Sequence, residues 1–402
     1  MIISLLRMAK YGLPDDVRFC VRCVMSNQRP ASSVEHKNTP DSKKVTLHID
    51  SDGVCDACRV AEAKQSIDWV ARETELFMLL DKHRSKTGAH DCIVPGSGGK
   101  DSYYAAHVLK HKYGMHPLLV TWSPHIATKW GARNLERWQA IADSVVVTPN
   151  RTVHRLMTRL ALENLLHPFQ PFVLGQKNLA PKLSIQYGIP LVFYGESEAE
   201  YGNPKAESES GKRGVGYYSD TGGIHLGGVS VHDLRTRYAL SDSDLDAYIP
   251  ADRGELDQFD VDVRYLGYYL KWHPQSCYYY AVEHGGFEPN PERTPGTYSK
   301  YNSIDDKLDD LHYFTTWVKF GLGRATYDAA QEIRSGDITR EEGVALVHKF
   351  DGEYPERFER EVFEYLSVPG FEPMTRDYFL ALCEKYKSPH LWDGNKLRHV
   401  VT

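Results

Sequence analysis

The sequence predicts an α/β protein whose centre is a doubly wound parallel sheet. Four short apolar runs, DCIVP, HPLLVTW, DSVVVTP and IPLVFY, are typical of buried parallel strands. Helical patterns near residues 101–113, 129–142, 151–166 and 176–188 alternate with these runs, as expected for strands joined by helical crossovers. Ligands bind such sheets beyond the carboxyl ends of the strands, so the residues that follow each run are the first candidates for a site.

The chain divides into three expected regions. Residues 1–62 carry two cysteine pairs and are expected to form a zinc-knuckle module. Residues 63–260 hold the strand–helix alternation, and residues 261–402 are expected to be mainly helical and to serve a substrate or partner. The stretch 61–86 should form one amphipathic helix that links the module to the sheet. Its apolar residues at helical spacing are Ile67, Val70, Thr74, Phe77 and Leu80.

The composition is that of an ordinary globular protein. The chain has 402 residues, of which 41% are hydrophobic and 25% charged. Its net charge of −6 gives no electrostatic case for a dedicated nucleic-acid binder. No stretch approaches the roughly 20 apolar residues of a membrane span, and the opening MIISLLRMAKYG is too short for a secretory core. We therefore expect a cytoplasmic protein with no membrane span and no nucleic-acid partner.

Four of the seven cysteines form two Cys-x-x-Cys pairs, Cys20/Cys23 and Cys55/Cys58. In a reducing compartment such pairs are more often metal knuckles or redox motifs than structural disulfides. One tetrahedral zinc needs four ligands, and two knuckles supply them, so we expect a structural Zn²⁺. Ordinary thiols or a redox pair remain the alternatives. The isolated Cys92, Cys277 and Cys383 are expected to be core thiols.

The stretch VPGSGGKDSYYAAHVLK, residues 94–110, has the features of a phosphate-binding loop. A strand over Cys92–Pro95 should lead through a turn at Gly96 to Gly99 into a helix that starts near Lys100. Glycines let the backbone approach a phosphate, and the helix N-terminus offers N–H donors and positive dipole charge. The loop is not a Walker A motif, because position 94 is Val and position 101 is Asp, and it is not the dinucleotide fingerprint.

The loop resembles the PP-loop, Ser-Gly-Gly-x-Asp-Ser, of the ATP pyrophosphatase superfamily. Ser97-Gly98-Gly99-Lys100-Asp101-Ser102 match this motif at every fixed position. The resemblance implies an adenine nucleotide alpha hydrolase-like fold that binds ATP and cleaves it between the α and β phosphates. It also implies that the loop grips pyrophosphate while AMP passes to a substrate oxygen. Mg²⁺ is expected to bridge the phosphates.

Longer segments resemble the N-acetyl sugar amidotransferase family. The similar segments are CVRCVMSNQRP, IDSDGVCDAC, YLGYYLKWHP, the block from RTPGTYSKYN to HKFDGEYP, and HLWDGNKLRHV. An insertion at about 35–44 departs from the usual opening of this family. The resemblance implies an enzyme that converts the acetamido group of a nucleotide-linked sugar to an acetamidino group, for lipopolysaccharide O-antigen or flagellin glycans. It also implies that a separate glutaminase, with a cyclase-like companion, supplies the ammonia.

Further candidate site residues lie outside the loop. Glu196 follows the fourth apolar run, in a polar, glycine-rich segment, 195–228, that we expect to be a mobile loop over the nucleotide. Lys319 and Arg324 flank a glycine turn, where two cations suit a diphosphate or a sugar carboxylate. They could equally pair with the acidic residues at 305–310. Lys177 is a weaker candidate for a phosphate contact, and Glu196 could be a loop carboxylate without a ligand.

The nucleophile that displaces AMP decides between the remaining alternatives. No cysteine lies in a glutaminase context, so ammonia would come from another subunit. Sulfur transfer to tRNA, a second activity that combines zinc knuckles with a PP-loop, predicts a basic face and a catalytic thiol near the loop, and neither is evident. A nucleotide-binding adaptor without activity is the third possibility, and the intact loop argues against it.

Overall fold

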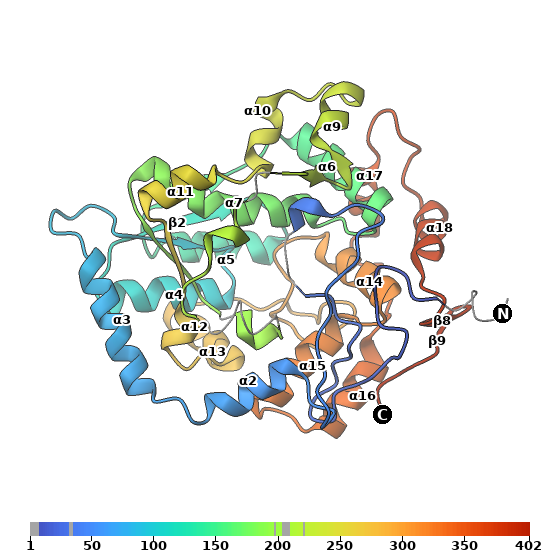
Figure 1. The fold of residues 1–402 in the computed structure, drawn as a ribbon, viewed down its shortest axis with the longest axis horizontal. Coiled ribbons are helices and arrows are strands. Elements are labelled where there is room, and N and C mark those ends of the chain that lie inside the picture. The colour runs from blue at the N-terminus through green and yellow to red at the C-terminus, as the bar shows by residue number, and fades with distance from the viewer. Residues whose placement is uncertain (1–7, 32–34, 197, 203–209, 220–221) are drawn as a thin grey trace.

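The computed structural model describes residues 8–31, 35–196, 198–202, 210–219 and 222–402 (Figure 1). Its centre is a five-stranded parallel sheet with the strand order β3-β2-β1-β4-β7. The strands are β1 (Cys92–Pro95), β2 (Pro117–Trp122), β3 (Ser144–Val147), β4 (Leu191–Tyr194) and β7 (Asp262–Tyr265). The order reverses at β1, because β2 lies on one side of it and β4 on the other. The expected doubly wound parallel sheet is confirmed.

The fifth strand, β7, was not predicted. Its sequence, DVRY, alternates polar and apolar residues instead of forming an apolar run, as suits a strand at the edge of a sheet. It pairs with β4, with Leu191 opposite Asp262 and Tyr194 opposite Tyr265. The sheet therefore extends past residue 260, where the sequence suggested that the helical region begins.

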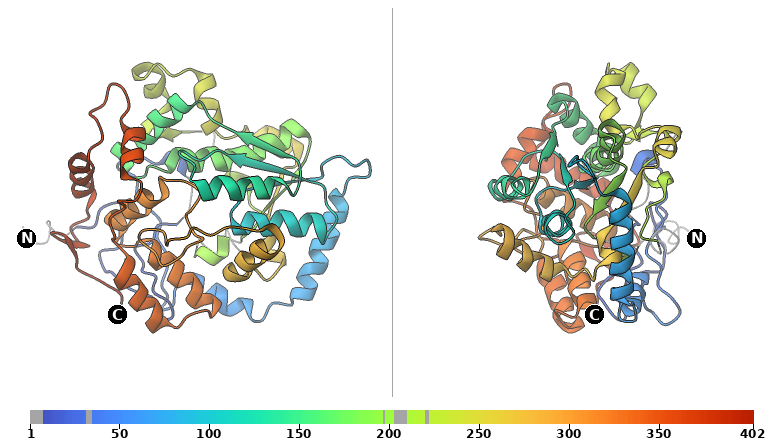
Figure 2. Two further views of the ribbon diagram at one scale, coloured as in Figure 1. Left: turned by 180° about the vertical axis from the view of Figure 1, so that it is seen from behind. Right: turned by 90° about the vertical axis from the view of Figure 1, so that its left-hand side faces the viewer.

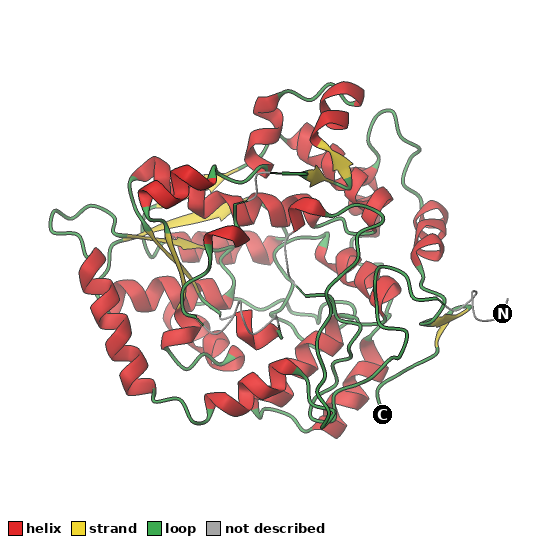
Figure 3. Ribbon diagram, in the orientation of Figure 1, coloured by secondary structure: helices red, strands yellow, loops and turns green. Residues whose placement is uncertain are grey.

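Helices cover both faces of the sheet (Figures 2 and 3). The elements packed on one face are α3 (Trp69–His83), α4 (Lys100–His111), α5 (Lys129–Gln139), α12 (Leu266–Tyr269) and α13 (Pro274–Gly285). The other face carries α6 (Arg151–Leu165), α7 (Gln170–Tyr187) and α11 (Arg253–Phe259). Successive strand residues point to opposite faces, so Cys92 and Val94 join the first core while Ile93 joins the second.

The single helix expected over 61–86 is two helices. α2 (Asp56–Lys64) ends before Gln65, and α3 begins after Asp68, whose carboxylate accepts hydrogen bonds from the backbone N–H groups of Val70 and Ala71. The expected apolar face was also wrong in part. The residues of α3 that are buried are Leu76 and Leu80, whereas Val70 is 78% exposed and Phe77 44% exposed.

The C-terminal region is helical, as expected. It contains α14 (Asp309–Phe320), α15 (Arg324–Ser335), α16 (Arg340–Phe350), α17 (Glu359–Leu366), α18 (Arg376–Tyr386) and a small hairpin of β8 (Trp392–Asp393) and β9 (Lys396–Leu397). Apolar residues at helical spacing before and within α14 are all buried, namely Ile304, Leu308, Leu311, Thr315 and Val318. The N-terminal segment packs against α15 and α16 (Figure 1), so the two ends of the chain share one core.

Short elements complete the fold. They are η1 (Glu35–Lys37), η2 (Glu198–Tyr201), η3 (Val215–Tyr217), β5 (His225–Leu226), β6 (Val229–Ser230), α9 (Val231–Arg237), α10 (Asp242–Leu245) and η4 (Asp246–Tyr248). The segment expected to be a mobile loop, 195–228, includes η2, η3 and β5, and its residues 197, 203–209 and 220–221 lie outside the described residues. Among the helices of the described ranges, none combines the length and apolar character needed to cross a membrane.

Candidate functional site

The loop that resembles a PP-loop lies at the carboxyl edge of the sheet, between the end of β1 and the start of α4. The backbone N–H of Gly96 donates to the carbonyl of Val120 at 3.0 Å, and the hydroxyl of Thr121 donates to the carbonyl of Gly96 at 2.8 Å. β2 therefore holds the start of the loop. Gly99 caps α4 without a side chain, so the first N–H groups of the helix are directed at the loop, as an anion site requires.

Gly98 is the position at which this loop depends most on glycine. Its φ is +85°, and a Cβ atom there would lie 2.6 Å from Cα of Leu135 in α5. If the loop cleaves ATP, as its resemblance to a PP-loop implies, Gly98→Ala should displace the loop and lower that cleavage by roughly 10²-fold, because a shift on the order of 1 Å is enough for such a loss. Pyrophosphate release measures the effect. Gly88→Ala is the matched control, since Gly88 has a φ of +82° but no neighbour within 4 Å. Equal pyrophosphate release by the two variants would contradict this role of Gly98.

Two carboxylates, Asp101 and Glu196, lie close enough beyond the ends of β1 and β4 for their charges to interact. Asp101 accepts from Lys100 Nζ at 2.6 Å and from Trp272 Nε1 at 3.1 Å. Glu196 follows β4, and burial together with the charge of Asp101 raises the pKa of Glu196 to about 7. Ionisation of Glu196 beside Asp101 destabilises the folded protein, and a cation bound between the two carboxylates would offset this destabilisation. Asp101 and Glu196 are thus suited to hold a divalent cation against a bound polyphosphate.

Asp305 is a site residue that the sequence did not reveal. The hydroxyl of Ser97, the first serine of the loop, donates to the Asp305 carboxylate at 2.6 Å. Burial raises the pKa of Asp305 to about 6, and the hydrogen bond from Ser97 partly opposes this. The Asp305 carbonyl accepts from the N–H of Thr128 at 3.0 Å, just before α5. In the sequence Asp305 stands among several acidic residues, and only the packing of the C-terminal region on α5 brings it to the loop.

A cavity of about 470 Å³ opens beside the loop. Its volume is in the range of small-molecule sites. Ser97 lies in its wall together with residues that follow β2 and with residues at the start of α14. The residues that give it polar and aromatic character are Trp122, Ser123, Arg151, Phe169, Phe172, Gln176, Asp305 and Asp309. The cavity lies beyond the carboxyl ends of β1 and β2, where the nucleotide of a doubly wound fold binds.

Other predicted residues lie elsewhere. The Ser102 hydroxyl donates to the carbonyl of Gly99 at 3.0 Å, within the first turn of α4. Lys319 Nζ donates to the carbonyl of Leu165 at 2.7 Å and lines a different cavity. Arg324 pairs with Asp328 at 3.1 Å and donates to the hydroxyl of Tyr313. Lys319 and Arg324 therefore do not point into one shared space, and neither lines the cavity beside the loop.

Cys277 lies in α13, where the charges of Asp101 and Lys100 both act on its thiol. The thiol is 2% exposed, and burial raises its pKa, so it is not ionised at neutral pH. A sulfur-transferring thiol needs the thiolate, and Cys277 therefore has the properties of the core thiol that was expected. Cys92 and Cys383 are also buried, each in a different core.

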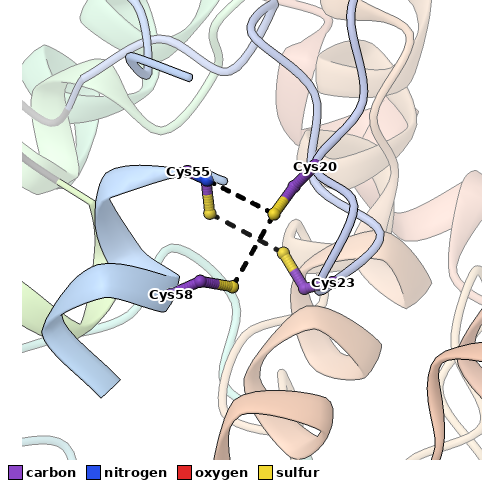
Figure 4. A group of neighbouring side chains, drawn as sticks. All are labelled: Cys20, Cys23, Cys55 and Cys58. Carbon is purple, nitrogen blue, oxygen red and sulfur yellow. Dashed lines mark hydrogen bonds between the residues drawn. The ribbon is translucent and has the colours of Figure 1, made fainter. Parts of the chain in front are cut away.

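The four cysteines of the two knuckles converge (Figure 4). The Sγ atoms of Cys20 and Cys58 are 3.8 Å apart, as are those of Cys23 and Cys55, and all four lie within 4.8 Å of one another. Four sulfurs at about 2.3 Å from one tetrahedral zinc would be about 3.8 Å apart, so the cluster fits such an ion. The set is buried, with a short loop and the start of α2 each supplying one pair. The cluster can hold a metal, and zinc is the ion that its chemistry favours.

The comparisons with known proteins concern the C-terminal region and the fold. The family model described as "LPS biosynthesis protein WbpG-like, C-terminal domain" matches residues 295–402. No curated protein is similar to the chain at a significant level. Among solved structures, the NH3-dependent NAD synthetase from Campylobacter jejuni subsp. jejuni NCTC 11168, in complex with the nitrate ion, is similar over 48% of this chain and 83% of that chain. Its sequence identity is 13% and its TM-score is 0.27.

The matched residues run from before α14 to the end of the chain and include Asp305, the partner of Ser97. The match agrees with the resemblance that the sequence segments of this region predicted. Residues 295–402 are thus similar to the C-terminal domain of the proteins described as WbpG-like LPS biosynthesis proteins.

Proposed function

We propose that the chain is an ATP-dependent amidotransferase of surface-glycan biosynthesis. It adenylates the acetamido oxygen of a nucleotide-linked N-acetyl sugar and replaces that oxygen with ammonia, releasing AMP and pyrophosphate. The acetamido group becomes an acetamidino group. An acetamide is a poor electrophile because its oxygen leaves badly, and transfer of AMP to that oxygen makes AMP the leaving group.

The residues at the loop have distinct roles in this proposal. Ser97, Gly98 and Gly99, with the first N–H groups of α4, hold the β and γ phosphates that leave as pyrophosphate. Lys100 pairs with Asp101 and adds a positive charge next to the phosphates. Asp101 and Glu196 would hold Mg²⁺, which neutralises charge on the polyphosphate. Ser102 supports the first turn of α4. Exclusion of water from the site would protect the adenylate from hydrolysis.

One observation carries the proposal, namely the hydrogen bond between Ser97 and Asp305. It joins the loop that resembles a PP-loop to the region that matches the family model described as the C-terminal domain of a WbpG-like LPS biosynthesis protein. When polyphosphate binds, the Ser97 hydroxyl must leave Asp305 and donate to a phosphate oxygen. The C-terminal domain therefore contributes directly to the site at which ATP would react, as expected if that domain adapts a general ATP chemistry to a sugar substrate.

Mass spectrometry tests the reaction. The chain is incubated with ATP, magnesium, ammonium salt and a panel of nucleotide-linked N-acetyl sugars. A product in which one oxygen is replaced by NH, formed together with AMP and pyrophosphate, is the expected result. AMP formation that depends on tRNA and a sulfur donor, with no sugar product, would contradict the proposal and support the thiolation alternative.

The source of ammonia gives a further prediction. We expect the purified chain to use ammonium salt and to fail with glutamine, because none of its cysteines lies in a glutaminase context. Addition of a cognate glutaminase with its cyclase-like companion should restore glutamine use, measured as amidine formed and glutamate released. Glutamate release by the isolated chain would show that it has a glutaminase site of its own, and the two-component proposal would fail.

A further inference from the structure

A second cavity lies between the N-terminal module, α7 and the C-terminal domain. It has a volume of about 260 Å³ and is distinct from the cavity beside Ser97. We call it the Arg29 cavity. Its walls combine cations with aromatic and aliphatic side chains. The residues of its lining that carry this character are Tyr11, Arg29, Lys44, Leu166, Lys177, His312, Lys319, Phe320 and Tyr327.

Arg29 is the residue that best indicates what kind of ligand this cavity binds. Its side chain is 4% exposed, and within the described residues its Nη1 atom has no hydrogen-bond partner and its guanidinium forms no ion pair. The guanidinium lies over the ring of Tyr327, 5.9 Å from the ring centroid. A buried charge without a partner is unfavourable, so a buried arginine at a cavity wall indicates an anion that pairs with it.

The backbone holds Arg29 firmly in place. The N–H of Arg29 donates to the carbonyl of Ser26 at 3.2 Å, and the carbonyl of Arg29 accepts from the N–H of Leu47 at 2.8 Å. Ser26 lies three residues after Cys23, and Leu47 belongs to the same buried cluster as the four cysteines. The four-cysteine module thus presents Arg29 to the cavity. The other cations are Lys44, which belongs to the same N-terminal module, Lys177 of α7 and Lys319 of α14.

The Arg29 cavity adjoins another cavity near the end of β4. Lys177 and Tyr217 line it and also line a third cavity of about 230 Å³, whose wall includes Glu196. That third cavity is rich in tyrosine, with Tyr194, Tyr201 and Tyr265 among its residues. A ligand that occupied both cavities, with its reacting group near Glu196, would have to pass Lys177 and Tyr217.

We propose that the Arg29 cavity binds the diphosphate of the nucleotide-linked sugar, with Arg29 as its central ligand. This rests on the proposed function, because it assumes an acceptor that reacts beside Glu196. Arginine donates two parallel hydrogen bonds to phosphate oxygens, and Lys319 and Lys177 add positive charge on the other walls. The aromatic rings of Tyr11, Phe320 and Tyr327 suit a nucleoside. The carboxylate of an acidic sugar offers the same acceptor chemistry, and the experiment separates the two sources.

The test measures binding of UDP and, in a second arm, of glucuronate to the full chain. Both are titrated by calorimetry in the presence of saturating α,β-methylene-ATP, which occupies the loop site and cannot be cleaved there. We expect UDP to bind and Arg29→Met to weaken it by at least about 10-fold, because a hydrogen bond to a charged group contributes roughly 1.5–3 kcal/mol. The affinity of Arg29→Lys for UDP should lie between that of the native chain and that of Arg29→Met. Arg253→Met, which removes an exposed arginine on α11, is the matched control and should bind as the native chain does.

Several outcomes would overturn the proposal. One is an Arg29→Met variant that melts like the native chain and binds UDP with unchanged affinity. Another is Arg29-dependent binding of glucuronate without binding of UDP, which would assign the cavity to a carboxylate. If Arg29→Met does not fold, Lys44→Met, at a half-buried position of the wall, replaces it, and unchanged UDP affinity would count equally against the proposal.

The binding assay requires no turnover, so its result is independent of the proposed reaction. Arg29-dependent UDP binding without amidine formation from any nucleotide-linked sugar would refute the reaction and leave the diphosphate site standing. Amidine formation with an unchanged KM for the sugar nucleotide in Arg29→Met would refute the site and leave the reaction standing. The result we expect is a raised KM for the sugar nucleotide with the KM for ATP unchanged.

Discussion

Replacement of Glu196 by glutamine is expected to reduce AMP formation by roughly 10²- to 10³-fold, the typical loss when one preorganised electrostatic contact to a reacting group is removed. Glutamine keeps the size of the side chain but cannot neutralise a divalent cation. The same change should leave the fold intact or stabilise it. The pKa of Glu196 is raised to about 7 from the usual 4.5, which means that its ionised form is disfavoured in the folded protein.

The sign of this stability effect depends on pH. A carboxyl whose pKa is raised in the fold is protonated there at low pH and costs no charge burial, and the cost grows as the pH rises through about 7. The gain from Glu196→Gln should therefore be larger at pH 8 than at pH 5, measured as melting temperature without nucleotide or magnesium. Glu75→Gln, on α3 and outside the lining of the cavity beside the loop, is the control for a carboxylate that is not paired with Asp101. Normal AMP formation by Glu196→Gln would show that Glu196 has no role in the reaction.

Loss of the metal from the four-cysteine cluster is the second change with a large expected effect. Structural zinc sites contribute on the order of 10 kcal/mol to the folding of small domains, and here the cluster organises a segment with few regular elements. We expect Cys23→Ser, or a strong chelator, to unfold the N-terminal module and to expose the α15 surface on which it packs. Elemental analysis should find about one zinc per native chain.

Cys383→Ser is the control for this prediction, because Cys383 is equally buried but belongs to a separate core. It should alter the melting temperature modestly and leave the zinc content unchanged. Freshly prepared, unchelated protein that carries no metal would rule out a structural zinc. Because Arg29 is held by the same module, loss of the metal should also weaken UDP binding, which links this experiment to the Arg29 cavity.

The elements that could be predicted are those whose signals are local. A buried strand is an apolar run and a crossover helix has a period of 3.6 residues, so β1 to β4 and the helices α4, α5 and α6 were found close to their actual bounds. The next helix, α7, begins at Gln170, earlier than the expected start near residue 176. The loop at 97–102 is equally local, because a phosphate is bound by one turn and one helix N-terminus. Metal knuckles are local pairs, and two of them sufficed to predict the cluster of Cys20, Cys23, Cys55 and Cys58.

Tertiary packing decided the rest. β7 has no apolar run and becomes a strand because β4 offers it an edge. Which side of α3 is buried depends on the core that it meets, and the spacing of Val70 and Phe77 could not reveal that core. Asp305 reaches Ser97 across 208 positions of the chain, and Arg29 shares a cavity with Lys319 only because the N-terminal module packs on the C-terminal domain. Local signals were enough to predict four strands of the sheet, the phosphate-binding loop and the four-cysteine cluster, since periodicity and motif spacing are properties of neighbouring residues. The composition of the site was decided by contacts between distant segments, whose free energy depends on the packing of the whole chain.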